Sequence, residues 1–134
     1  MAYSGYFLKF GSAILPNSYY KQGGYSVTPN QRTELSATRD NNNYLSRVTS
    51  PNYKTKISIE TGILYLKDKI NIQNIMNQGC INSTERKYNI TYWNDEENCY
   101  INADFYMPDV TYTVLDTLGS DIIYQPVKFE FIQY

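Results

Sequence analysis

The sequence predicts a mainly β fold of the α+β class: an antiparallel barrel or sandwich of about seven to nine strands with one packed helix. Three observations support this. Fifteen tyrosines in 134 residues suit half-buried strand faces, because a rigid apolar ring carries one polar tip. The C-terminal third alternates apolar and polar residues in segment after segment, which is typical of strands. A single stretch, at about residues 64–78, has helical spacing instead.

The N-terminal part predicts short extended segments. Residues 6–10 form an apolar run typical of a strand, which Gly11 and Ser12 interrupt. Residues 14–17 form a second short stretch that ends in a turn. Residues 19–28 then favour an extended segment with a bulge or bend at Gly23 and Gly24.

A long polar segment at about residues 29–51 breaks this pattern. Loops of this length inside compact domains are usually functional or disordered. Two interpretations stay open: a mobile surface loop, or an extended hairpin or arm that becomes ordered against a neighbouring subunit. Arginine favours interfaces because its planar fork makes bidentate bonds. The expected interface residues are Arg32, Glu34, Arg39, Asp40, Tyr44 and Arg47.

The middle of the chain predicts one half-buried strand and the helix. Residues 54–60 alternate with a period of two, which places Ile57 and Ile59 inward. In the helix, apolar residues recur at helical spacing and Gly79 provides a stop signal. The apolar helical residues are Leu66, Ile70, Ile72, Ile75 and Met76.

The C-terminal third predicts consecutive strands. Residues 88–92 and 101–107 alternate on either side of the polar turn 95–98, which indicates a hairpin. A further strand begins at Val110, and residues 118–121 turn the chain into a last strand. We expect Phe105, Phe129 and Phe131 to lie in the core, beneath the helix face formed by Leu66, Ile70 and Met76.

Composition limits the classes of partner. The length fits one domain spanning residues 1–134, and the net charge is −1, from 12 basic and 13 acidic residues. Nucleic-acid binding is not expected, because it needs clustered Lys and Arg. Membrane association is not expected for the same reason, and no apolar run approaches the roughly 20 residues that span a bilayer. The N-terminus lacks a signal-peptide pattern, so we expect a cytosolic protein or part of a larger particle.

Enzymatic activity and cofactors are not expected either. Histidine is absent, which excludes Ser-His and Cys-His nucleophiles. Ser18 and Lys21 match a Ser-x-x-Lys pattern, but in an extended segment rather than on a helix. Cys80 and Cys99 indicate buried reduced thiols. The acidic turn 95–98 could offer oxygen ligands to calcium, although an ordinary hairpin turn explains it better. We expect no metal and no organic cofactor.

Several short motifs carry a resemblance that extends over most of the chain. They are Met1-Ala2-Tyr3-Ser4-Gly5-Tyr6, Val27-Thr28-Pro29-Asn30-Gln31-Arg32, Arg39-Asp40, Tyr44-Leu45-Ser46-Arg47, Thr55-Lys56-Ile57, Phe105-Tyr106-Met107-Pro108-Asp109 and Phe129-Glu130-Phe131-Ile132-Gln133-Tyr134. The chain resembles an uncharacterised family of small proteins encoded in the tail-gene clusters of tailed bacteriophages and prophages of Gram-positive gut bacteria. The expected fold also resembles the tail-tube fold, whose rings assemble through sheet edges and long loops; this is an analogy of fold.

The resemblance implies a structural tail component that assembles with itself, as a homo-oligomer, or with other phage tail proteins. It would lie in the bacterial cytoplasm when expressed from a prophage and in the virion tail when assembled. The alternative is a non-enzymatic binding module that contacts glycans or a host surface through its aromatic residues. A single-strand nucleic-acid binder is a weaker third hypothesis, which the negative net charge opposes.

Overall fold

The computed structural model describes residues 3–32 and 34–134; Met1 and Ala2 of the first motif and Thr33 of the polar segment lie outside the described residues. The described chain is mainly β with one α-helix, α1 (Leu66–Asn77), which confirms the predicted class. The strands are β1 (Leu8–Phe10), β2 (Ala13–Leu15), β3 (Tyr20–Gln31), β4 (Glu34–Arg39), β5 (Leu45–Thr49), β6 (Lys54–Thr61), β7 (Leu64–Tyr65), β8 (Cys80–Asn82), β9 (Lys87–Asn94), β10 (Cys99–Tyr106), β11 (Val114–Leu118), β12 (Asp121–Tyr124) and β13 (Lys128–Gln133). A short 3-10 helix, η1 (Asn17–Tyr19), precedes β3.

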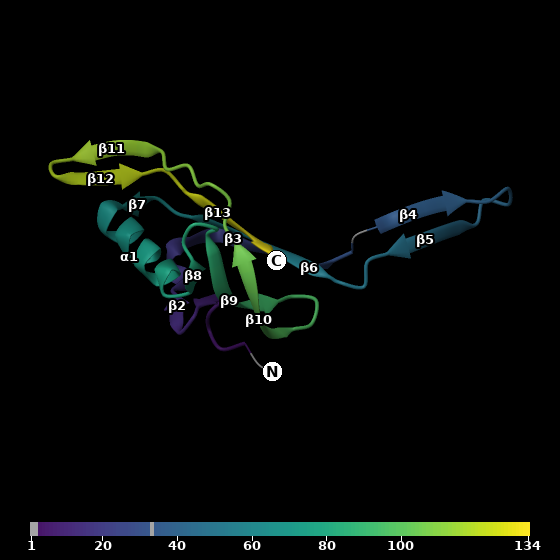
Figure 1. Ribbon diagram of the computed structural model, residues 1–134. Coiled ribbons are helices and arrows are strands. Elements are labelled where there is room, and N and C mark those ends of the chain that lie inside the picture. The colour runs from purple at the N-terminus through teal and green to yellow at the C-terminus, as the bar shows by residue number, and fades with distance from the viewer. Residues whose placement is uncertain (1–2, 33) are drawn as a thin grey trace.

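The main sheet is antiparallel and open, with the order β2-β1-β9-β10-β13-β6-β3 and β8 beside β9. Only Phe105↔Gln133 and Tyr106↔Ile132 join β10 to β13, whereas β9 and β10 pair along their whole length. The sheet folds at this short seam into two leaves, β2-β1-β9-β10 and β13-β6-β3. The result is a sandwich-like arrangement rather than a closed barrel (Figure 1).

The core lies between these leaves. Phe10 of β1 meets Phe131 of β13 with ring centroids 5.4 Å apart, and Tyr88 of β9 meets the same ring at 6.4 Å. Thr55 Oγ1 and Tyr92 Oη, one from each leaf, lie 3.0 Å apart in a buried hydrogen bond. The predicted alternation is confirmed, because Ile57, Ile59, Tyr88, Ile90, Tyr92, Phe105, Phe129 and Phe131 are all buried.

The helix occupies the predicted stretch but presents a different face to the core. Its buried residues are Ile72 and Met76, which lie one turn apart. Ile70 is 44% exposed, so its predicted place in the core is wrong. Two positions along a helix rotate the side chain by about 200°, and the burial of Ile72 therefore turns Ile70 toward solvent.

Two further expectations need correction. Residues 107–113 form no strand, and the strand expected from Val110 begins at Val114 instead. It belongs to a small sheet, β11-β12-β7, at the end of the molecule near α1 (Figure 1). Cys80 and Cys99 are free, as expected, but each is half-buried rather than buried.

The predicted polar loop at 29–51 is an ordered hairpin. β3 continues through Pro29 to Gln31, and the register shift between Thr28 and Gln31 accommodates the missing proline N–H. β4 and β5 then pair with each other. The described residues therefore form the hairpin of the second interpretation, and a ladder of hydrogen bonds replaces the irregular backbone expected of a loop. Ordering of this hairpin by a neighbouring subunit stays a prediction.

An aromatic cluster ties the leaves together at the edge opposite the seam. Tyr25 of β3 donates its hydroxyl hydrogen to the backbone oxygen of Trp93 in β9 at 2.7 Å, and its ring stacks on Phe7 at 4.5 Å. The predicted bend precedes Tyr25: Gly23 has a φ of +74°, and a Cβ on Gly24 would lie 2.3 Å from the Glu60 oxygen. Burial, followed by the charge of Asp95, raises the pKa of Tyr25 well above its ordinary value.

Replacing Phe129 with alanine should lower the free energy of unfolding by about 3–5 kcal/mol, because the ring is fully buried and would leave a cavity. Urea unfolding monitored by circular dichroism measures this loss. The exposed neighbour Lys128 is the control, and its alanine variant should stay within about 0.5 kcal/mol of the parent. A loss below about 1 kcal/mol for Phe129→Ala would reject the core placement.

Alkaline pH should destabilise the fold through two partly buried tyrosines, Tyr20 and Tyr25. Burial raises the pKa of both Tyr20 and Tyr25 in the folded state. The two tyrosines therefore make their full contribution to the free energy of unfolding below the unfolded-state tyrosine pKa of about 10. This contribution is lost as the pH rises toward their higher pKa values in the folded state. Unfolding free energies measured between pH 8 and 11 should fall above pH 10, and less steeply in Tyr25→Phe. Identical slopes in parent and variant would contradict this.

Candidate functional site

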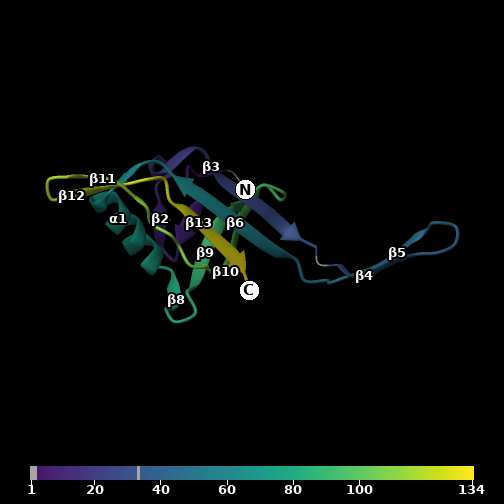
Figure 2. The same cartoon turned by 90° about the horizontal axis from the view of Figure 1, so that it is seen from above.

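The β4–β5 hairpin, called the arm below, projects from one end of the molecule (Figure 1) and extends past the main sheet in the perpendicular view (Figure 2). Every described residue from 31 to 49 is exposed. The arm begins and ends at β3 and β6, which pair with each other in the main sheet. The sandwich therefore carries a segment whose described residues are all exposed and pair only with each other.

The tip of the arm is a defined turn. Asp40 Oδ1 accepts hydrogen bonds from the backbone N–H groups of Asn42 at 2.9 Å and Tyr44 at 3.0 Å. Arg39 Nη1 donates to the Asn43 oxygen at 3.0 Å, and Asn43 has a φ of +66°, a conformation that asparagine tolerates. Asp40 and Arg39 thus order the tip.

The Tyr44 side chain at this tip is 72% exposed. Its backbone takes part in the Asp40 turn, but its ring stacks on no described aromatic residue. The predicted interface tyrosine is therefore presented to solvent at the most distant point of the arm.

Charged residues form contacts in the body and at the root of the arm. Glu34 Oε1 and Arg47 Nε, on opposite strands, lie 2.5 Å apart. At the root, the Arg32 guanidinium lies 3.9 Å from the centre of the Tyr53 ring, and its Nη2 is 3.8 Å from Glu96 Oε1 in the β9–β10 turn. Exposed pairs of this kind contribute about 0–1 kcal/mol each, so they orient the arm more than they stabilise it.

The six predicted interface residues therefore form separate groups. Glu34 and Arg47 lie together in the body of the arm, and Arg39, Asp40 and Tyr44 lie together at the tip. Arg32 is directed toward the root instead.

The two faces of the arm differ in chemistry. The pairs Ala37↔Arg47 and Arg39↔Leu45 alternate onto one face, and Ser36↔Val48 and Thr38↔Ser46 onto the other. Leu35, Leu45 and Val48 are exposed apolar side chains that sequence reasoning did not assign to the interface. They are isolated apolar residues in a polar stretch and do not recur with the period of two that marks a strand face, so the sequence offered no clear signal for them.

A second exposed apolar surface, called the far end below, lies at the opposite end of the molecule (Figure 1). Its residues are Ile63, Tyr65, Ile70, Val114, Leu115 and Leu118. The β11–β12 hairpin there also carries Asp116 and Asp121 and no basic residue. Neither aspartate forms an ion pair with a described residue. The sequence predicted a strand here and the turn at residues 118–121, but neither the separate strand β12 nor the exposure of these residues.

The acidic turn 95–98 has the geometry of a hairpin turn. Asn94 Oδ1 accepts from the N–H groups of Glu96 at 2.9 Å and Glu97 at 3.1 Å, and Asn98 adopts a φ of +55°. No cluster of three or more potential metal-ligating residues occurs within the described ranges. Over those same ranges, no helix has the length and apolar character needed to cross a membrane. The absence of enzymatic activity stays a prediction.

Comparison with known proteins gives one match. A model for a family of unknown function, DUF6711, matches residues 1–134. The chain belongs to this family. No curated protein and no solved structure matches it. Membership of DUF6711 therefore does not indicate an activity.

Limited proteolysis of the isolated protein should cut the arm first. Trypsin cleaves after arginine, and Arg39 and Arg47 lie in an exposed hairpin without tertiary packing, where local opening costs little free energy. Mass spectrometry of early fragments identifies the site, with Arg86, in the turn beside the core, as the internal comparison. Equal resistance at all three arginines would contradict the placement.

Proposed function

We propose that this protein is a non-enzymatic structural component that assembles through protein–protein contacts, with the arm as a principal contact surface. One observation carries the proposal: the arm is held in shape by its own hydrogen bonds and ion pair, yet all of its described residues are exposed, apolar side chains included. A free hairpin of two strands is marginally stable in water. Packing against a partner would bury its apolar residues and stabilise it.

The far end provides a second surface that complements the arm. Exposed apolar patches of this kind mark interaction sites, and the aspartates of the β11–β12 hairpin have the opposite charge to Arg39 at the arm tip. An arm from one copy that contacts the far end of the next makes a head-to-tail interface. Such interfaces generate rings when the rotation closes. Self-assembly into a homo-oligomer is therefore our principal proposal.

The kind of particle to which this assembly belongs is proposed from the sequence resemblance. Motifs such as Phe105-Tyr106-Met107-Pro108-Asp109 resemble small proteins from phage tail-gene clusters. We therefore propose a tail-tube-like or tail-associated protein that contacts itself or other phage tail proteins. It would be made in the bacterial cytoplasm from a prophage and reside in the virion tail. The balanced charge supports neither nucleic acid nor membrane as a partner.

Substitution of one residue on each face of the arm tests the proposal. Leu45→Asp replaces an exposed apolar side chain on the face that also carries Arg39 and Arg47, whereas Ser46→Asp, its matched control, places the same charge on the opposite face without removing an apolar side chain. Both positions are exposed, so neither variant should lose more than about 0.5 kcal/mol of folding free energy. Size-exclusion chromatography with light scattering should detect concentration-dependent oligomers for the parent and Ser46→Asp. Leu45→Asp should shift the assembly midpoint by about tenfold or more in concentration.

Leu118→Asp, which changes the most exposed apolar residue of the far end, should weaken assembly to a similar degree if the contact is head-to-tail. Parent protein that stays monomeric up to the millimolar range, and that binds glycans on an array, would contradict self-assembly and favour the binding-module alternative. Oligomers unaffected by Leu45→Asp would contradict the role of the arm.

A further inference from the structure

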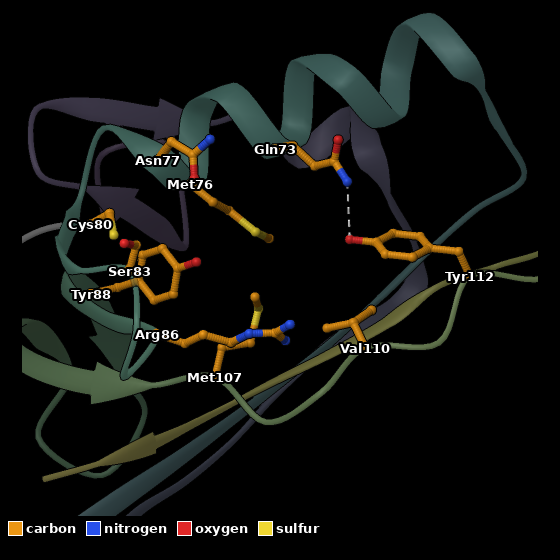
Figure 3. Close-up of a pocket in the computed structure, with 10 residues that line it drawn as sticks. All are labelled: Gln73, Met76, Asn77, Cys80, Ser83, Arg86, Tyr88, Met107, Val110 and Tyr112. Carbon is orange, nitrogen blue, oxygen red and sulfur yellow. Dashed lines mark hydrogen bonds between the residues drawn. The ribbon is translucent and has the colours of Figure 1, made fainter.

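A cavity of about 390 Å³ lies away from both the arm and the far end. Three segments distant in the sequence enclose it: α1, the turn between β8 and β9, and the irregular segment 107–112 (Figure 3). Its volume falls within the range of small-molecule sites, which is about 300–1,000 Å³. Nothing in the assembly proposal uses this cavity.

One part of the wall is apolar and adaptable. Met76 from α1 and Met107 and Val110 from the irregular segment point their side chains toward the open centre (Figure 3). Methionine thioethers are flexible and polarisable, so they fit ligands of irregular shape. This part of the wall suits a short hydrocarbon chain.

Tyr88 supplies an unpartnered polar group. The residue is only 7% exposed, and its hydroxyl points into the cavity (Figure 3) without a hydrogen-bond partner among the described residues. Burial, with a smaller contribution from Cys80 and against the lowering effect of Arg86, raises the pKa of Tyr88. An ordinary tyrosine is already protonated at neutral pH, so the hydroxyl can donate a hydrogen bond there. The ring is mostly buried, whereas the hydroxyl is open to the cavity, so a ligand there can accept its hydrogen bond.

Arg86 is the only charged residue that lines the cavity. Its guanidinium extends toward the centre (Figure 3), where Nη1 lies 3.5 Å from the Pro108 oxygen and 3.4 Å from Asp109 Oδ1. The Asp109 side chain is fully solvent-exposed, so this ion pair is weak. The remaining guanidinium N–H groups are available to a planar anion, which arginine binds with two parallel hydrogen bonds.

The amides of Gln73 and Asn77 line the helix side of the cavity, and Gln73 Nε2 donates to the Tyr112 hydroxyl at 3.2 Å (Figure 3). The lining therefore combines one cation, no anion, several neutral donors and an apolar wall. A single guanidinium matches one negative charge better than the two charges of a phosphate monoester. We propose that this cavity binds a small organic monocarboxylate with a short apolar chain, its carboxylate on Arg86 and Tyr88 and its chain against Met76, Met107 and Val110.

Octanoate is a suitable probe, with 1-octanol as the uncharged control. Titration of the parent protein, followed by NMR chemical shifts of the methionine methyl groups, should give saturable binding of octanoate and binding of octanol weaker by about tenfold. The shifts should affect Met76 and Met107 together, since both line the cavity.

Three variants test the carboxylate contacts. Arg86→Gln and Tyr88→Phe each remove a donor and should weaken octanoate binding, by about tenfold and a few-fold respectively. Asp109→Asn removes the competing carboxylate and should strengthen it. Lys21→Gln, which removes the same charge from an exposed side chain outside the cavity, is the control and should leave it unchanged. Comparable NMR dispersion in all four variants establishes that the fold is intact.

Absence of saturable octanoate binding would overturn the proposal. Equal affinity for octanoate and octanol would also overturn it, because the site would then recognise only the apolar chain. So would unchanged affinity in Arg86→Gln. Each of these outcomes is independent of whether the protein assembles through its arm.

Discussion

The face-to-face packing of the two leaves is the constraint on which the rest of the structure depends. Backbone pairing joins β10 to β13 at two positions, and one further hydrogen bond runs from the Tyr134 N–H to the Asp104 oxygen. This seam is short, so side-chain packing must contribute to holding the leaves together. Phe131 contacts both Phe10 and Tyr88 across the interior, and the Tyr25–Trp93 hydrogen bond ties the opposite edge. The abundance of tyrosine has a physical reason here: its ring fills the core, and its hydroxyl bonds the backbone of the facing leaf.

Both proposed sites are consequences of this packing. The arm continues from β3 and β6, which pair with each other in the main sheet, so its direction is set by the core while its residues remain exposed. The cavity forms where α1 covers the sandwich through Ile72 and Met76 and the irregular segment 107–113 passes beside it. A structural subunit and a small-ligand site can coexist because they use different surfaces of one framework.

The sequence predicted the features that depend on local periodicity. Alternation identified the buried faces of β6, β9 and β13, because one side of each strand must meet the core. Helical spacing located α1 but not its orientation, since a helix with apolar residues on several sides can rotate, and Ile70 was consequently misplaced. The arm has no core-facing side, so its strands lack the alternation that reveals a strand. The cavity could not be predicted at all, because residues such as Gln73, Arg86 and Val110 meet only through the tertiary fold.

Hydrogen–deuterium exchange of the parent protein at low and high concentration tests most directly whether the arm is an assembly surface. Arm amides in β4 and β5 should exchange rapidly in dilute solution, because every described residue there is exposed. They should become protected as oligomers form, whereas the amides of β9 and β10 should remain equally protected throughout. Oligomers whose arm amides still exchange as in the monomer would contradict the account.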